Sequence, residues 1–297
     1  MSALPRVAWI GLGIMGGHPW PKNLLKAGYS VTGHTLEAHK LDRLAASGGT
    51  AAASVREAVR GADVVVTMLP GSPDVEAVAH GEDGILAHAA PGTLLVDMSS
   101  VDPRTSVALA AAAAPRRIRV LDAPVSGGEA GAVEGSLSIM VGGGEGDFDE
   151  ARPLFAALGT TIVRCGPHGS RPDREGRQPA DRRRAPPGRR RSRRLPAEGR
   201  RRPRRRPRRA RRRSRRVGRP RPQAGQLPRP RVPPGFRIDL HHKDMGIVTT
   251  AARALGAALP VGGLVAQLIA AARAQGDGHL DHSALLRGVE RLSGVAS

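Results

Sequence analysis

Apolar and polar positions change their spacing repeatedly along residues 1–165, and these changes predict strands and helices in turn. Short apolar runs are typical of buried strands, whereas apolar residues three or four positions apart are typical of amphipathic helices. The expected strands cover residues 6–10, 29–33, 58–70, 92–100, 118–128, 136–143 and 161–166, and the expected helices cover 23–28, 74–86 and 104–114. This alternation predicts an α/β fold with a doubly wound parallel sheet.

Helical spacing returns near the C-terminus after a long interruption. Residues 235–256, 259–276 and 281–292 each space Leu, Val, Ile and Ala as helices do. We therefore expect an α/β domain over residues 1–165, a disrupted segment over 166–233, and the remnant of an all-helical second domain over 234–297.

The interruption differs in composition from the rest of the chain. Residues 171–233 contain 28 Arg, 12 Pro, four acidic residues and no Lys. Their formal charge is +24, so the other 234 residues sum to −3, although the whole chain carries +21. Neither secondary-structure period occurs there, and the charges repel one another, so we expect disorder. The segment is either a nucleic-acid-binding arm or the result of a reading-frame change.

Three further observations bear on the setting of the protein. Cys165 is the single cysteine, so no intrachain disulfide can form. The N-terminus lacks the long apolar region of a secretory signal, and no apolar run is long enough to span a membrane. We expect a cytoplasmic protein with no membrane partner and no metal site.

A glycine motif follows the first expected strand. Gly11, Gly13 and Gly16 form G-x-G-x-x-G before a helix, which allows a tight turn, a close approach of the backbone to a pyrophosphate, and close helix packing. The motif alone is also compatible with an ordinary glycine-rich turn, but the repeating strands and helices favour a Rossmann-type dinucleotide site. The expected cofactor contacts in this loop are Gly11, Leu12, Gly13, Ile14, Met15 and Gly16.

The end of the second strand bears on the choice of cofactor. An acid at this place binds the ribose hydroxyls of NAD, and an arginine accommodates the 2′-phosphate of NADP. The sequence here is His34, Thr35, Leu36 and Glu37. The lack of an arginine favours NAD over NADP, although His39 and Lys40 could meet a phosphate. Glu37 is also compatible with a solvated position at a helix start.

Several ordered motifs resemble one known family. GLGIMG, MLPGSPDVEAV, DMSSVDP, DAPVSGGEAGAVEGSLSIMVGG and, after the Arg segment, PGFRIDLHHKD are similar to motifs of the β-hydroxyacid dehydrogenases. The resemblance covers residues 6 to about 170 and 234 to about 293. It implies a Rossmann domain, a helical second domain, a catalytic cleft between them, an NAD(P) cofactor and a homo-oligomer.

The resemblance also implies roles for individual residues. Cofactor contacts are expected from Thr35, Leu69, Pro70, Ser100 and Lys243, and contacts with a substrate carboxylate from Ser126, Gly127, Gly128 and Lys243. A hydroxyl and unhindered backbone N–H groups suit an anion. Ser126 is otherwise compatible with a simple turn and Lys243 with a solvated helix charge.

The general acid of the family is a lysine, and this chain lacks it. The lysine is expected near Glu175, within the Arg-rich segment, where no lysine occurs. Reading codons from their second base allows only Lys or Arg for Glu175 with Gly176, and the whole stretch from Pro172 to Arg182 can then read QTAKAANQLI. We therefore prefer compensating frame changes near residues 170 and 233 to an inserted arm.

A second irregularity follows the glycine motif. HPWP at residues 18–21 is one residue longer than the P-M-A of the family, and a shifted reading from His18 permits Pro-Met-Ala. A proline beyond the first position of a helix costs about 3 kcal/mol. This sequence therefore weakens the case for cofactor binding by the chain as written.

These observations lead to one main hypothesis and two alternatives. The main expectation is NAD(P)-dependent reduction of 2-hydroxy-3-oxopropanoate to glycerate, with the chain as written inactive for lack of its lysine. The alternative within the family is the dehydrogenation of 3-hydroxyisobutyrate. The alternative of another class is an Arg-rich nucleic-acid-binding protein, but the segment has no aromatic residue for stacking on bases, so no specific nucleic-acid partner is expected.

Overall fold

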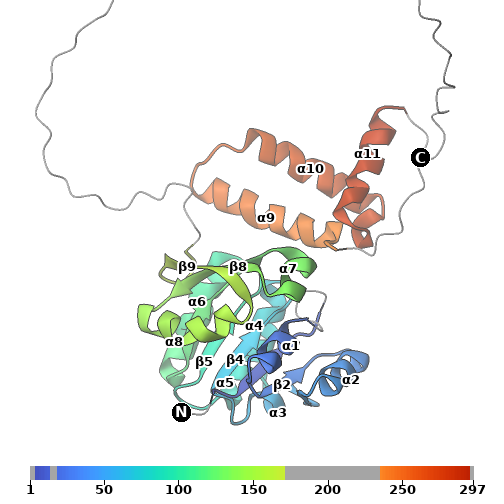
Figure 1. Ribbon diagram of the computed structural model, residues 1–297. Coiled ribbons are helices and arrows are strands. Elements are labelled where there is room, and N and C mark those ends of the chain that lie inside the picture. Colours follow the sequence, from blue (N-terminus) through green and yellow to red (C-terminus); the bar gives the residue numbers. More distant parts are fainter. Residues whose placement is uncertain (1–3, 14–18, 171–234, 295–297) are drawn as a thin grey trace, which may run out of the picture. The chain divides into compact units, whose positions relative to one another are not determined.

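The structure is a computed structural model that describes residues 4–13, 19–170 and 235–294. These residues all belong to one structural unit, formed by residues 1–174 and 232–297. The Arg-rich segment, and with it the expectation of disorder there, lies outside the described residues. Figure 1 labels the helices and strands discussed below.

One sheet forms the centre of the N-terminal part, in the order β3-β2-β1-β4-β5-β6-β8-β7, with β9 also paired to β8. The pairs from β3 to β6 are all parallel, which confirms the doubly wound sheet predicted from the sequence. The strands are β1 Val7–Ile10, β2 Val31–His34, β3 Thr50–Ala51, β4 Val64–Thr67, β5 Leu94–Asp97, β6 Arg119–Asp122, β7 Val125–Ser126, β8 Leu137–Gly143 and β9 Gly159–Gly166.

The far edge of the sheet corrects the prediction of a wholly parallel arrangement. Strand β8 runs antiparallel to both β6 and β7. Only residues 127–136 separate β7 from β8, and a parallel crossover needs a dozen or more residues. The apolar pattern could not reveal this reversal, because a buried strand has the same pattern in either direction.

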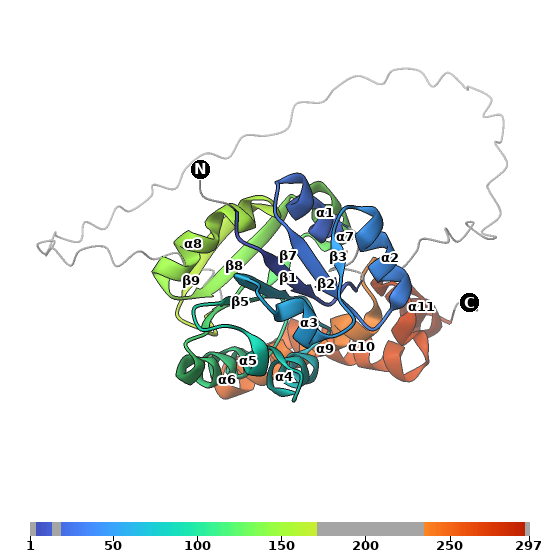
Figure 2. The ribbon, with the colours of Figure 1, turned by 90° about the horizontal axis from the view of Figure 1, so that it is seen from below.

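Helices cover both faces of the sheet, as Figure 2 shows. Successive residues of a strand point to opposite faces, so Val7 and Trp9 join one buried cluster and Ala8 and Ile10 the other. One cluster includes residues of α1, α2, α7 and α8, and the other includes residues of α3 to α6. These helices are α1 Pro19–Lys26, α2 Ala38–Ala46, α3 Val55–Val59, α4 Ser72–His80, α5 Ile85–His88, α6 Pro103–Ala113, α7 Gly128–Glu134 and α8 Glu145–Ala156.

The C-terminal part is helical, as the sequence predicts. It contains α9 Ile238–Ala254, α10 Pro260–Ala274 and α11 Leu285–Leu292. Helices α9 and α10 lie side by side (Figure 1). Among the residues that the structure describes, the buried apolar cluster here consists of Ile238, Ile269 and Ala272.

Hydrogen bonds and ion pairs of two carboxylates connect the helices of this part. The Asp281 carboxylate accepts N–H groups of Gly235, Phe236 and Ser283 at 3.0, 3.1 and 2.9 Å, and so links the start of α9 to the turn before α11. The buried Asp277 carboxylate pairs with Arg287 at 2.7 Å and Arg291 at 3.1 Å. Among the described residues, no helix is long and apolar enough to cross a membrane.

Candidate functional site

The carboxyl ends of β1, β4, β5 and β6 meet at one edge of the sheet, where dinucleotides bind in open α/β folds. Gly11 directly follows β1 and has φ +97°, a conformation that favours glycine. A Cβ at Gly11 would lie 2.4 Å from the carbonyl oxygen of Met68, whereas a Cβ at Gly13 would meet no atom of the described residues within 4 Å. Gly11 is thus required by the fold, and Gly13 leaves open space beside the backbone.

The remaining loop residues, Ile14, Met15 and Gly16, lie outside the described residues. Helix α1 begins at Pro19, which makes Pro19 and Pro21 its first and third residues. The N–H groups of a first helical turn have no partner within the helix, so Pro21 removes none of its hydrogen bonds. The large helix penalty expected from the sequence is therefore avoided. The same two prolines, however, remove two N–H donors from a helix end that should face a phosphate.

The ends of β4 and β5 are joined by a buried polar network. Thr67 Oγ1 donates to Asp97 Oδ1 at 2.8 Å, and the N–H of Ser99 donates to the same oxygen at 3.1 Å. Ser99 Oγ in turn accepts the N–H of Leu69 at 2.9 Å. This network fixes Leu69, and with it the backbone before Pro70, next to Gly11.

Asp97 is the functional-site candidate that sequence reasoning missed. Its side chain is buried, and Oδ2 has no hydrogen-bond partner among the described residues. Burial raises the pKa of Asp97 to about 6, against the opposing hydrogen bonds from Ser99 and Thr67. The apolar pattern predicts a strand at this position, and only the pairing of β4 with β5 reveals a buried carboxyl group.

Ser100 and Lys243 are brought together. Lys243 Nζ donates to the carbonyl oxygen of Ser100 at 2.7 Å and lies 3.1 Å from Asp244 Oδ1. A Cβ on Gly71 would lie 3.4 Å from the Lys243 side chain. Lys243 is therefore not an isolated solvated charge, since its ammonium contacts the loop that follows β5.

Ser126, Gly127 and Gly128 lie where β7 gives way to α7. All three are exposed, and both glycines have positive φ, 139° and 60°. Their exposure makes the Ser126 side chain and the backbone of both glycines accessible to a ligand, as an anion site requires. None of the described hydrogen bonds joins Ser126 to Ser100 or Lys243.

Asp122, at the end of β6, fastens the last described residues before the Arg-rich segment. Its carboxylate oxygens accept the N–H of Gly169 at 3.2 and 3.3 Å, and His168 Nδ1 lies 3.4 Å from Oδ1. Sequence reasoning did not single out this aspartate. The position expected for the catalytic lysine, Glu175, lies outside the described residues. No group of three or more metal-binding side chains occurs among the residues that the structure describes.

The dinucleotide-type fold agrees with comparisons to known proteins. The profile of the NAD binding domain of 6-phosphogluconate dehydrogenase matches residues 6–166. A second profile, described as the NAD-binding of NADP-dependent 3-hydroxyisobutyrate dehydrogenase, matches residues 223–289.

Full-length and partial relatives are both found. The 2-hydroxy-3-oxopropionate reductase of Escherichia coli is 32% identical over 312 residues, covering 97% of this chain and 98% of its own. The NAD-dependent L-serine dehydrogenase of Pseudomonas aeruginosa is 48% identical over 167 residues and is covered over 56% of its length. The chain thus spans about half the length of that curated relative and of several others that it matches. A solved structure, 3-hydroxyisobutyrate dehydrogenase of Mycobacterium tuberculosis, has a TM-score of 0.69 at 26% identity, covering 96% of this chain and 99% of that one.

A parallel sheet with a glycine turn after its first strand, followed by a helical part, is the architecture of a nicotinamide-dinucleotide-binding protein. Within that class, the chain belongs to the β-hydroxyacid dehydrogenase family.

Proposed function

We propose that the functional product of this gene is an NAD(P)-dependent reductase that interconverts 2-hydroxy-3-oxopropanoate and glycerate. The observation that carries the proposal is the likeness to 2-hydroxy-3-oxopropionate reductase along nearly the whole length of both chains. From the sequence we still expect a cytoplasmic protein. We also expect it to consist of an α/β domain over residues 1–165, a disrupted segment over 166–233, and a helical remnant over 234–297.

The cofactor fits the residues that are present. Gly11 allows the backbone to pass close to Met68, and the Asp97 network holds the loop at Leu69 and Pro70 beside it. We propose that these residues and Ser100 hold a nicotinamide cofactor, which supplies hydride to the aldehyde carbon when bound. Ser126, Gly127 and Gly128 are proposed to bind the substrate carboxylate, with Lys243 reaching the same edge from α9.

The chain as written lacks the proton donor that this chemistry needs. Negative charge develops on the aldehyde oxygen during reduction, and a positioned acid accelerates proton transfer by about 100- to 10,000-fold. Since no lysine occurs in residues 171–233, we expect the written chain to be inactive or nearly so.

The test compares two proteins, the chain as written and the product of a gene in which residues 171–233 are read in the shifted frame. We expect the second to reduce 2-hydroxy-3-oxopropanoate and the first to show no activity above background. Reduction at ordinary enzymatic rates by the written chain would overturn the argument from the missing lysine.

A second substrate deserves a parallel assay, because a full-length structural relative is a 3-hydroxyisobutyrate dehydrogenase. The corresponding semialdehyde, 2-methyl-3-oxopropanoate, should give a lower kcat/KM with the shifted-frame protein. The opposite order would replace the proposed substrate with this one and leave the reaction type unchanged.

A further inference from the structure

Helix α10 has apolar residues on every side. Its sequence is PVGGLVAQLIAAARA, in which only Gln267 and Arg273 have polar side chains. A helix that is apolar all round is buried on all sides in a folded protein. One side of α10 meets this expectation, because Ile269 and Ala272 are buried together with Ile238 of α9. The other side of the helix needs a second neighbour.

The described residues do not supply that second neighbour. Val261, Leu264 and Leu268 follow one another at spacings of three and four residues, so they form one stripe along α10. Val261 is 72% exposed and Leu264 is 62% exposed. A stripe of large apolar side chains open to water is a mark of a surface that binds another protein chain.

Helix α11, which packs against α10 (Figure 1), is turned with its charged side inward. Arg287 and Arg291 pair with the buried Asp277 carboxylate at 2.7 and 3.1 Å. On the other side of the helix, Leu286 is 60% exposed and Val289 is 52% exposed. A surface helix ordinarily buries its apolar side and exposes its charges. The reversed arrangement of α11 leaves its apolar side available to a partner.

The rest of the chain has little with which to cover these side chains. In residues 171–233 the only Leu, Val, Ile, Met or aromatic residues are Leu195, Val217, Leu227 and Val232. No two of them are three, four or seven positions apart, so they do not make the apolar stripe of a helix. The other undescribed stretches, 1–3, 14–18 and 295–297, are at most five residues long.

A second copy of the chain does supply a matching surface. Residues 235–294 contain six Lys or Arg and five Asp or Glu, so their formal charge is +1 and two copies of this part repel each other little. The second copy presents the same apolar side chains. Homodimers pair one patch with its own copy about a twofold axis, which suits a surface that is apolar and nearly neutral.

We infer that the exposed apolar side chains of α10 and α11 form the interface of a homodimer of this chain. We call this surface the apolar face; its residues are Val261, Leu264, Leu268, Leu286 and Val289. The inference assigns to particular residues the homo-oligomer that the family resemblance implies only in general terms. It does not depend on the proposed function, because it needs neither a cofactor nor the missing lysine.

The net charge of the chain gives this dimer a characteristic salt dependence. Each copy carries +21, so two copies repel each other at low ionic strength. The Debye length falls from about 30 Å at 0.01 M salt to about 8 Å at 0.15 M, whereas burial of apolar surface does not require charge. Salt should therefore strengthen the dimer. Association through contaminating nucleic acid would instead weaken with salt.

The test is sedimentation velocity of the full chain, freed of nucleic acid, at protein concentrations between about 1 and 100 µM. We expect a monomer–dimer equilibrium whose Kd falls at least about 10-fold between low salt and about 0.5 M salt. Hydrogen exchange of the same samples should show amides of α10 and α11 becoming more protected as the protein concentration rises.

A double substitution removes the apolar face while leaving the fold intact. Leu264→Gln with Val289→Gln changes two exposed side chains, each of which occurs twice in the dimer, so the Kd should rise at least about 100-fold. The matched control is Val107→Gln on α6, because Val107 is 51% exposed and lies outside the apolar face. It should leave the Kd unchanged. Circular dichroism verifies that both variants are folded.

Four results would overturn the inference. A monomer at every concentration and salt would refute the dimer, and protection of α10 that is independent of concentration would show that the chain covers the face itself. A dimer that survives the double substitution would use another surface. Open-ended aggregates in place of a dimer would contradict the twofold pairing. None of these results bears on the reductase activity of the shifted-frame protein, which is assayed separately.

Discussion

Gly11 and Gly13 stand two residues apart in the same motif, yet the structure gives them different tasks. Gly11 has a positive φ and no room for a Cβ, whereas a Cβ at Gly13 would be clear of every described residue. The motif predicted both as cofactor contacts, because the sequence cannot separate a glycine required by the fold from one required by a ligand. That separation depends on the position of Met68, which directly follows another strand, β4.

This difference predicts unequal effects of two alanine substitutions. Gly11→Ala should lower the free energy of unfolding by about 1–3 kcal/mol from backbone strain, and further from the contact with Met68. Gly13→Ala should change stability by less than about 1 kcal/mol while weakening cofactor binding. Urea unfolding measures the first effect and calorimetry the second. Equal losses of stability in both variants would contradict this reading of the turn.

Asp97 shows what lies beyond sequence reasoning at the same scale. The DMSS motif drew attention to Ser100, and the aspartate was read as part of a strand. Its chemical character arises only from burial between neighbouring strands, with Thr67 and Ser99 as donors. Residues far apart in the sequence form this environment, so no local sequence pattern can predict it.

A pH dependence follows from the buried carboxyl. The pKa of Asp97 is raised from 3.8 to about 6, so folding favours the protonated form. This contribution is present below about pH 4 and is lost as the pH rises through 6, a change on the order of 3 kcal/mol. The difference in unfolding free energy between wild type and Asp97→Asn should fall by this order between pH 4 and 7.

The control for that measurement is Asp63, whose contribution to stability should change with pH in the opposite direction. Hydrogen bonds from Arg6 lower the pKa of the Asp63 carboxyl, so its contribution is present at neutral pH and lost in acid. Asp63→Asn should therefore differ from wild type most near pH 7. If Asp97→Asn followed the same trend as Asp63→Asn, the raised pKa of Asp97 would be refuted.

At the scale of elements, the spacing of apolar residues predicted most strands and the C-terminal helices. The spacing did not predict the direction of a strand, and so it did not reveal that β8 is antiparallel to its neighbours β6 and β7. It also missed α8, whose sequence contains Pro153, because a proline within a pattern normally argues against a helix interior. The element is held by Phe148, Leu154 and Phe155, which are buried against the sheet.

Hydrogen bonds and ion pairs of carboxylates stabilise the helical part, because its buried apolar cluster among the described residues is small. Asp281→Ala removes the acceptor for three N–H groups at the start of α9 and near α11, and should cost about 1 kcal/mol. Amide exchange along α9 should accelerate about fivefold as a result. These hydrogen bonds hold the pKa of Asp281 well below its usual range, so the contribution is present at neutral pH and fades in strong acid.

Glu290→Ala provides the comparison, since the Glu290 side chain makes no hydrogen bond or ion pair among the described residues. Its amide exchange along α9 should match that of the wild type. Exchange that is equally fast in both variants would show that loss of negative charge, rather than loss of the Asp281 hydrogen bonds, loosens the helix.

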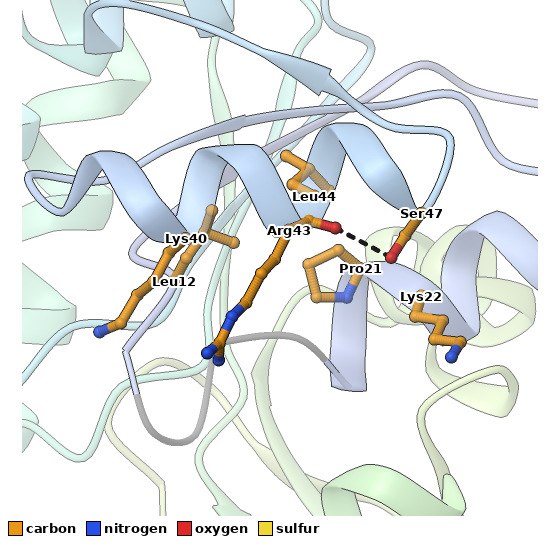
Figure 3. Close-up of a pocket in the computed structure, with 7 residues that line it drawn as sticks. All are labelled: Leu12, Pro21, Lys22, Lys40, Arg43, Leu44 and Ser47. Carbon is orange, nitrogen blue, oxygen red and sulfur yellow. Dashed lines mark hydrogen bonds between the residues drawn. The ribbon is translucent and has the colours of Figure 1, made fainter.

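For the whole molecule, net charge and function belong to different parts of the chain. Residues 171–233 carry +24 and the remainder −3, so the strongly basic character says little about the cofactor-binding part. The sequence predicted this separation because charge is additive along a chain. It could not predict that Lys22 of α1 and Lys40 and Arg43 of α2 line one small pocket (Figure 3), because this depends on side chains from two helices meeting in space.

The full chain should bind DNA weakly and without sequence preference. Counterion release makes such binding steeply salt-dependent, with an affinity loss of about 1,000-fold or more between 50 and 200 mM salt for six or more phosphate contacts. A gel-shift assay with two unrelated duplexes tests this, and a chain lacking residues 171–233 serves as the control. A marked preference for one duplex would favour the nucleic-acid-binding hypothesis over a reading-frame change, and the absence of salt-sensitive binding would remove that hypothesis.

The hydrogen bond between Asp122 and Gly169 also bears on how the missing lysine could be restored by protein engineering. The Asp122 carboxylate, at the end of β6, accepts the N–H of Gly169 and so fixes the backbone there. A peptide joined after Ser170 therefore starts at a defined position and in a defined direction. A helix transplanted from a relative, complete with its lysine, could be attached there without redesigning the sheet. Ser170 is thus the natural junction for a chimaera that restores the lysine that the written chain lacks.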